Sequence, residues 1–268
     1  MVSLVIATVI VGVVFAGLVF LIQDSLIYHP RRYTEDYFEN LKRTGGEELA
    51  FQADQGKQFV YVIPPKTGAP PEEVWLCFSG NGGTALDWAV HFYPHPEEDA
   101  FLLIDYPGYG QSEGEPSPKA IEETILGAVT AYLARTGGKM KELRPKLRVF
   151  GHSIGAASAL IAARELGAEK AVLISPFGRM KDLIAPPLRP LLRHRFDNVE
   201  SLERIADSGL TFKADVFHGT RDSVIPYSMA VSLSEDFPSM ITLHAVEGAG
   251  HNDILDAAAG EIAAAMGE

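Results

Sequence analysis

The sequence predicts an α/β domain with a mostly parallel central sheet and helices on both faces, preceded by one transmembrane helix. Short apolar runs that suit buried strands alternate with longer segments that suit helices, as in a parallel sheet covered on both sides. The chain has 268 residues, of which 47% are hydrophobic, and this is enough for one such domain with a large core. An uncharged apolar run at the N-terminus predicts the transmembrane helix.

The N-terminal run at residues 2–22 carries no charged side chain. At about 1.5 Å per residue, a helix over these residues would be about 31 Å long, close to the roughly 30 Å of a bilayer core. A buried core helix of this length would normally show a polar face, and a cleaved signal peptide would have a shorter apolar region followed by a cleavage site. We therefore expect a single-pass membrane anchor at residues 1–23 and a juxtamembrane linker at 24–46.

Positive charges flank the run on one side. No Lys or Arg precedes it, and four follow it closely, namely Arg31, Arg32, Lys42 and Arg43. Cytoplasmic flanks of membrane helices carry an excess of Lys and Arg. The charges therefore favour a cytoplasmic location for the domain that follows.

The rest of the chain, residues 47–268, has the rhythm of one domain. Two short strands surround a turn at 54–56, a proline-rich loop follows, and strands then alternate with helices, one of them rich in alanine. The predicted strands are 47–51, 58–63, 74–78, 101–105, 147–150, 171–175, 212–217 and 241–246. The predicted helices are 85–92, 117–135, 154–166, 227–235 and 253–266.

The segment 176–210 interrupts this alternation. It is long, it contains several prolines, and it connects a strand to the next one, so that it starts and finishes near the edge where ligands bind in parallel sheets. We expect it to form a small lid over that edge.

Composition excludes several other classes of function. A net charge of −12 argues against nucleic acid as a partner, because phosphate binding requires clustered Lys and Arg. The single cysteine, Cys77, lies in an apolar run and allows neither an internal disulfide nor a cysteine-based metal site. We expect no metal and no cofactor.

Residues 151–155, Gly-His-Ser-Ile-Gly, match the G-x-S-x-G pattern of a nucleophile on a tight strand-to-helix turn. Side chains at the two glycine positions would collide with the backbone of such a turn, and the helix that follows directs free N–H groups at the serine. Ser153 is therefore the predicted nucleophile. The alternative is an ordinary helix-capping serine.

A serine nucleophile needs a histidine to accept its proton and a carboxylate to orient that histidine. With this kind of turn the carboxylate follows the serine in the sequence and the histidine comes last. Asp222 follows the predicted strand at 212–217, and His251 follows the next strand. Both loops end at the same edge of a parallel sheet as Ser153, and the three residues form the predicted catalytic triad.

Acyl transfer also needs N–H donors that stabilise the negative oxygen of the intermediate. One donor should be the backbone of Ile154, directly after the nucleophile, and the second should come from the glycine-rich loop at 79–84. We assign the second donor to Asn81. This loop is not followed by the Lys-Ser/Thr pair of a phosphate-binding loop.

Four motifs together resemble the serine α/β-hydrolases: Gly-His-Ser-Ile-Gly at 151–155, Asp-Tyr-Pro-Gly-Tyr-Gly-Gln-Ser-Glu-Gly at 105–114, His-Gly-Thr-Arg-Asp at 218–222 and Gly-His-Asn-Asp at 250–253. The segments Gln-Asp-Ser-Leu-Ile-Tyr-His-Pro at 23–30 and Leu-Arg-His-Arg-Phe-Asp at 192–197 look like the branch of this superfamily that carries an N-terminal membrane anchor. The resemblance implies the α/β-hydrolase fold. One departure is that Ser79 stands where the family usually has a histidine that supports the oxyanion loop.

The resulting hypothesis is a serine hydrolase that cleaves carboxylic esters or thioesters through an acyl-enzyme on Ser153. Its location near a bilayer would suit lipid-like acyl substrates. Two alternatives are a serine peptidase similar to the prolyl oligopeptidases and a catalytically silent membrane-anchored scaffold.

Overall fold

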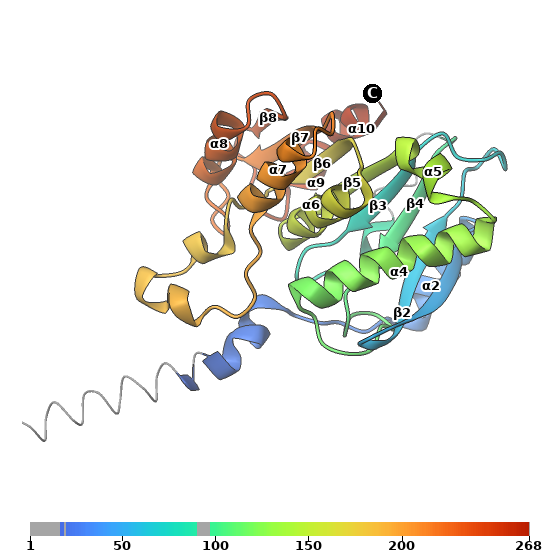
Figure 1. Ribbon diagram of the computed structural model, residues 1–268, viewed down its shortest axis with the longest axis horizontal. Helices are drawn as coiled ribbons and strands as arrows, with labels where there is room; N and C mark the ends of the chain where they lie inside the picture. Colours follow the sequence, from blue (N-terminus) through green and yellow to red (C-terminus); the bar gives the residue numbers. More distant parts are fainter. Residues whose placement is uncertain (1–16, 19, 90–96, 268) are drawn as a thin grey trace, which may run out of the picture.

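A computed structural model describes residues 17–18, 20–89 and 97–267, and within these residues the chain folds around an eight-stranded sheet (Figure 1). The strand order is β1-β2-β4-β3-β5-β6-β7-β8. Strand β2 pairs antiparallel with both β1 and β4, and every other pairing is parallel. The predicted mostly parallel sheet is confirmed.

All eight predicted strands are present, with ends that differ from the prediction by at most two residues. They are β1 (Glu47–Ala53), β2 (Gly56–Ile63), β3 (Val74–Phe78), β4 (Ala100–Ile104), β5 (Leu147–His152), β6 (Lys170–Ile174), β7 (Lys213–Gly219) and β8 (Ile241–Val246). Strand ends are where an apolar pattern is least informative, because added residues such as His152 and His218 are paired in the sheet although they are not apolar.

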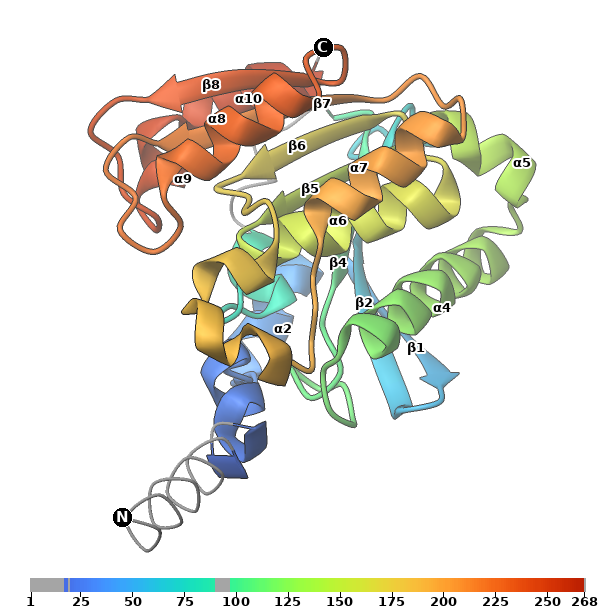
Figure 2. The same ribbon diagram turned by 60° about the vertical axis from the view of Figure 1, so that its left-hand side comes forward.

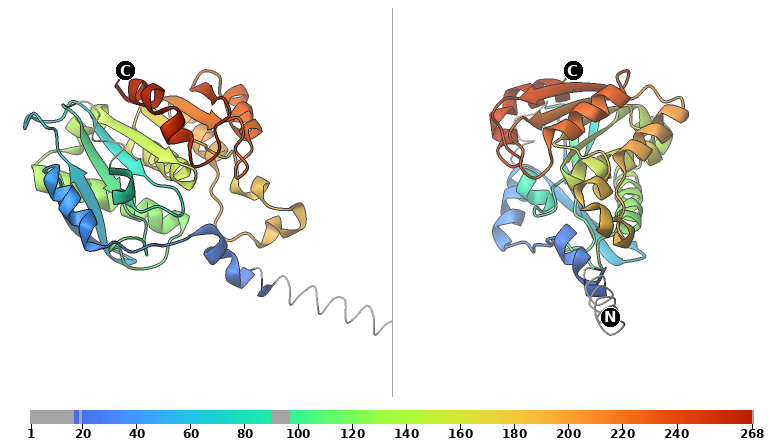
Figure 3. Two further views of the ribbon diagram at one scale, coloured as in Figure 1. Left: turned by 180° about the vertical axis from the view of Figure 1, so that it is seen from behind. Right: turned by 90° about the vertical axis from the view of Figure 1, so that its left-hand side faces the viewer.

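Two hydrophobic cores lie on opposite faces of the sheet. Along β3, Val74, Leu76 and Phe78 pack into one core, whereas Trp75 and Cys77 pack into the other, as the two-residue period of a strand requires. Helices α4 (Pro118–Thr136), α6 (Ile154–Leu166), α7 (Asn198–Asp207) and α8 (Tyr227–Asp236) contribute to the first core. Helices α2 (Glu35–Arg43), α9 (Ile254–Ala257) and α10 (Ala259–Gly267) contribute to the second, and α2 and α10 lie in front of the sheet when it is seen from behind (Figure 3).

Two predicted helices differ from the structure. The closing helix predicted at 253–266 is divided into α9 and α10 at Ala258, whose φ of −117° and ψ of 21° leave the helical region. The helix predicted at 85–92 begins as the 3-10 turn η1 (Ala85–Trp88), and its last residues lie outside the described part. The remaining short turns are α5 (Met140–Leu143), η2 (Arg144–Lys146), η3 (Met180–Leu183) and η4 (Pro186–Leu191).

The region predicted as a linker, residues 24–46, is folded onto the domain. Residues 20–27 are helical, and α2 packs against the sheet through Leu41. Tyr28 is also buried. Burial of these apolar side chains is favourable enough to order a segment that composition alone marks as a connector. Of the predicted anchor, residues 1–16 and 19 lie outside the described residues, and among the residues described no helix is long and apolar enough to cross a membrane.

The segment predicted as a lid, 176–210, has two parts. Its first part projects from the sheet edge through η3 and η4, next to the N-terminal helix (Figure 2). Its second part is α7, which packs on α6 through the buried Leu202 and Ile205 and belongs to the body of the domain. The Asp197 carboxylate accepts a hydrogen bond from the Glu200 N–H at 2.9 Å and begins this helix. The name lid segment is therefore kept for residues 176–197 alone.

Candidate active site

Ser153 lies between β5 and α6 in a strained turn, with φ of 58° and ψ of −118°. Its N–H donates to the Ile174 carbonyl at 2.8 Å, which fixes the turn to the neighbouring strand. A Cβ atom on Gly151 would lie 2.1 Å from the Gly155 carbonyl oxygen, and one on Gly155 would lie 2.3 Å from the Phe78 carbonyl oxygen. Because neither contact is possible, the turn requires glycine at both positions.

Asp222 and His251 lie side by side at the same sheet edge, with 2.7 Å between His251 Nδ1 and Asp222 Oδ2. The other carboxylate oxygen accepts hydrogen bonds from the N–H groups of Val224 and Ile225, each at 2.8 Å. Burial raises the pKa of Asp222, but the hydrogen bonds to His251 and to these backbone groups outweigh it and leave the pKa below its usual 3.8. An ionised Asp222 keeps the proton of His251 on Nδ1, so that Nε2 can accept a proton.

Ser153 and His251 line one cavity of about 520 Å³. Within the described part of the chain the Ser153 hydroxyl makes no hydrogen bond, so the serine and the histidine share the cavity without being bonded. The hydrogen bond between a catalytic serine and its histidine is often long in the absence of substrate and shortens when substrate binds. The structure thus brings two of the three predicted triad residues into contact and places the third beside them.

Two further histidines support this pair, although the sequence motifs give them no catalytic role. His218 Nε2 lies 2.9 Å from the Ile225 carbonyl and 3.4 Å from Asp222 Oδ2, and the ring is fully buried. His152 Nε2 lies 2.9 Å from the His251 carbonyl, so a neutral ring must donate this bond through Nε2–H. Burial, with a smaller effect of His251, lowers the pKa of His152 to about 4.

The predicted oxyanion loop, residues 79–84, carries Ser79 where the resemblance implies a histidine. The Ser79 hydroxyl donates to the Gly83 carbonyl at 3.0 Å, and the Tyr106 hydroxyl donates to the Ser79 carbonyl at 2.6 Å. Asn81 accepts at its carbonyl from the Tyr109 hydroxyl at 2.7 Å. The serine and two tyrosines therefore fix the loop that the missing histidine would otherwise support.

Asn81 and Ile154, the predicted oxyanion donors, both line a second cavity that also reaches Ser153. Among the described residues, no carbonyl accepts from the N–H of Asn81 or of Ile154. Two unpaired N–H groups next to a serine hydroxyl are the arrangement that an oxyanion needs.

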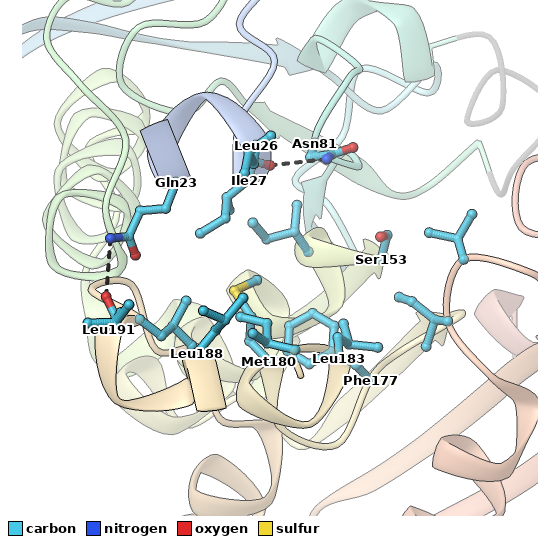
Figure 4. A pocket seen from close by; sticks show the side chains of 15 residues that line it. Gln23, Leu26, Ile27, Asn81, Ser153, Phe177, Met180, Leu183, Leu188 and Leu191 are labelled. Atoms are coloured by element: carbon cyan, nitrogen blue, oxygen red, sulfur yellow. Dashed lines mark hydrogen bonds between the residues drawn. The ribbon is translucent and has the colours of Figure 1, made fainter. Parts of the chain in front are cut away.

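The second cavity is apolar and has a volume of about 330 Å³ (Figure 4). Besides Ser153 and the two donors, it is lined by residues of the N-terminal helix, the lid segment and the loop after Asp222: Gln23, Leu26, Ile27, Phe177, Met180, Leu183, Ile184, Leu188, Leu191, Leu192, Val224 and Ile225. Gln23, Leu26 and Ile27 belong to the motif at 23–30, which in the sequence points only to a membrane-anchored branch and not to a cavity, because a wall built from distant segments leaves no local pattern. In the part of the chain that the structure describes, no three His, Cys, Asp or Glu side chains are grouped so that they could hold a metal ion.

The low pKa of His152 predicts a specific loss of stability in acid. An unfolded chain takes up this proton near pH 6.5, whereas the folded protein resists it down to about pH 4, so the free energy of unfolding falls as the pH drops below 6.5. In His152→Gln, which keeps an N–H donor for the His251 carbonyl, the difference in unfolding free energy between pH 7 and pH 5 should be about 2 kcal/mol smaller than in the wild type. Urea titrations at both pH values measure it. His29→Gln, at an exposed position, is the control and should match the wild type, and an equal pH dependence in all three proteins would contradict the prediction.

Comparisons with known proteins agree with this geometry. Residues 75–218 match the Alpha/beta hydrolase family. Alpha/beta hydrolase domain-containing protein 17C of Mus musculus is 33% identical over 189 residues, which cover 69% of this chain. The matched region spans only 57% of that relative's own length.

An uncharacterized protein of Mycobacterium tuberculosis is 26% identical over 249 residues, covering 91% of this chain and 86% of the relative. Among solved structures, an esterase of Pyrococcus furiosus superposes with a TM-score of 0.68 at 14% identity, covering 90% of this chain and 96% of the esterase. A likeness at that identity shows the fold alone. The family match, the relative at 33% identity and the fold together show that the chain belongs to the alpha/beta hydrolase family.

Proposed function

We propose that this hydrolase cleaves carboxylic esters or thioesters of apolar acyl chains through an acyl-enzyme on Ser153. The observation that carries the proposal is the apolar cavity, which opens at Ser153 and is bordered there by the two N–H donors. An acyl chain in this cavity would place its carbonyl carbon at the serine and its carbonyl oxygen at the donors.

In this mechanism His251 Nε2 takes the proton of the Ser153 hydroxyl while the serine oxygen attacks the carbonyl carbon. The negative oxygen of the tetrahedral intermediate accepts hydrogen bonds from the N–H groups of Asn81 and Ile154. The C–O or C–S bond to the leaving group then breaks, and His251 returns the proton to the alcohol or thiol. Water attacks the acyl-enzyme by the same route and releases the acid, while Asp222 keeps the His251 ring oriented throughout.

The two cavities that meet at Ser153 give the substrate a direction. The apolar cavity suits the acyl chain, whereas the 520 Å³ cavity is lined by polar groups that include Arg31, Asp87 and Asn252. A leaving group that enters this second cavity would have polar neighbours. The proposed substrate is therefore an apolar acyl group on a polar alcohol or thiol.

The proposed membrane anchor at residues 1–23 would hold this site at a bilayer, with the catalytic domain on the cytoplasmic side. The helix at residues 20–27 supports the proposal, because it leads from the apolar run directly to the apolar cavity. Lipid-like acyl substrates would then be available next to the cavity.

Ser153→Ala should lower esterase activity by a factor on the order of 10⁶, because it removes the nucleophile. A p-nitrophenyl ester assay measures the activity, and a fluorophosphonate probe should label the wild type and not the variant. Ser158→Ala, in the helix that follows Ser153, serves as the control and should retain activity. Esterase activity retained by a folded Ser153→Ala variant would refute the mechanism.

Leu188→Asp should lower kcat/KM for a long-chain ester about tenfold or more and leave kcat/KM for a butyrate ester nearly unaffected. A long acyl chain must displace water from the new carboxylate, which costs desolvation energy, whereas a butyryl chain is too short to reach it. A series of p-nitrophenyl esters measures the chain-length profile. Leu126→Asp introduces the same charge at an exposed position on α4, outside the cavity lining, and should leave the profile unchanged. Identical profiles in the two variants would argue against an acyl role for the cavity.

The full chain should sediment with membranes and resist carbonate extraction, because residues 2–22 form an uncharged apolar run. A chain that lacks residues 2–16 should remain in the supernatant and still react with the fluorophosphonate probe. Immunoblots of the two fractions measure the distribution. A full chain found only in the supernatant would rule out the anchor.

A further inference from the structure

The N-terminal segment at residues 23–29 contacts the lid segment through a buried glutamine. The side chain of Gln23 is 5% exposed, and its amide nitrogen donates to the Leu191 carbonyl at 3.2 Å and to the Phe20 carbonyl at 2.9 Å. Its amide oxygen accepts from the Arg193 N–H at 2.7 Å. Both ends of one side chain are therefore bound to the backbone of the lid segment, about 170 residues away in sequence.

Charged and aromatic contacts surround this glutamine. Asp24 forms an ion pair with Arg193 at 2.9 Å, and the Arg193 guanidinium lies 5.3 Å above the Phe20 ring. The ring of Tyr28 lies 5.4 Å from that of His194. The ion pair is partly exposed and contributes little by itself, so the buried bonds of Gln23 are the main polar link between the two segments.

The same N-terminal segment also holds the oxyanion loop. The Asn81 side chain donates to the Ile27 carbonyl at 3.1 Å, and the Asn81 carbonyl accepts from the His29 N–H at 3.2 Å. Figure 4 shows the two links apart from each other, from Gln23 to Leu191 and from Asn81 to Ile27, with the Asn81 link on the side of Ser153. Between them, Leu26 and Ile27 line the cavity wall.

We infer that Gln23 is a positioning residue of the active site, which holds the lid segment closed over the acyl cavity and so determines the preference for long acyl chains. The inference rests on the proposed function for its substrate and on the hydrogen bonds for its geometry. When Gln23 is lost, the Leu191 carbonyl and the Arg193 N–H have no partner at a buried contact, and the lid segment separates from the N-terminal helix. The far wall of the cavity then opens, while Ser153, Asp222 and His251 keep their places.

The inference predicts a loss that depends on chain length. In the full-length protein, Gln23→Ala should raise KM for p-nitrophenyl laurate about tenfold, whereas kcat for both laurate and butyrate esters and KM for butyrate should change less than about twofold. Ser25→Ala is the matched control, because Ser25 lies on the same helix, is exposed, bonds only to the Ile22 carbonyl and does not line the cavity. It should behave as the wild type with both esters.

A second measurement does not depend on activity. Amide hydrogen exchange in residues 180–196 should be faster in Gln23→Ala than in Ser25→Ala, while exchange in α6 stays the same. Unchanged exchange in the lid segment, or an equal loss on butyrate and laurate in a folded variant, would overturn the inference. A wild type that is inert to both esters would refute the proposed function, and hydrogen exchange would still report whether Gln23 closes the lid segment.

Discussion

The close approach of backbone segments at the carboxyl end of the sheet is the constraint on which the site depends. A Cβ on Gly155 would meet not only the Phe78 carbonyl but also that of Ser79, at 2.6 Å. The turn that carries Ser153 and the loop that carries Asn81 thus occupy adjoining space, and only a residue without a side chain fits between them. Gly219 has the same role between the loop that carries Asp222 and the loop that carries His251, since a Cβ on Gly219 would lie 2.3 Å from the Ala249 carbonyl oxygen.

This crowding explains why the chemistry needs so few side chains. Where two backbone segments lie in contact, their N–H and C=O groups are held in fixed positions. These groups form hydrogen bonds that orient the side chains of the site. The Ile225 N–H and carbonyl bind Asp222 and His218, and the His251 carbonyl binds His152. Burial lowers the pKa of both His152 and His218, so neither ring is expected to be a cation near pH 7. Among the described residues, the Asp222 carboxylate is then paired with a cation only when His251 accepts a proton. In the proposed mechanism this would stabilise the proton on His251.

Most of the fold was predictable, because the strands are short apolar runs whose signal is local. The meeting of Ser153, Asp222 and His251 was predictable for a similar reason, since each follows a strand and parallel strands end at one edge. The division of the closing helix at Ala258 was not, because the segment is rich in alanine, and its one glycine, Gly260, lies beyond the break and is tolerated inside a helical pattern. The packing of α7 was also missed, since proline-rich sequence just before it masks a short amphipathic helix whose apolar side faces α6.

The apolar cavity could not be predicted from the sequence, for a different reason. Its lining comes from the N-terminal helix, the oxyanion loop, the lid segment and the loop after Asp222, and contacts between segments far apart in sequence have no periodicity or motif. Gln23 illustrates this, because a glutamine after an apolar run is expected to be solvated, yet here it is buried with every polar group satisfied by a backbone partner. The proposed reaction chemistry depends on local turns, and each turn can be recognised by itself. The proposed substrate preference depends on the meeting of remote segments, so that members of one family can share a triad and differ in what they bind.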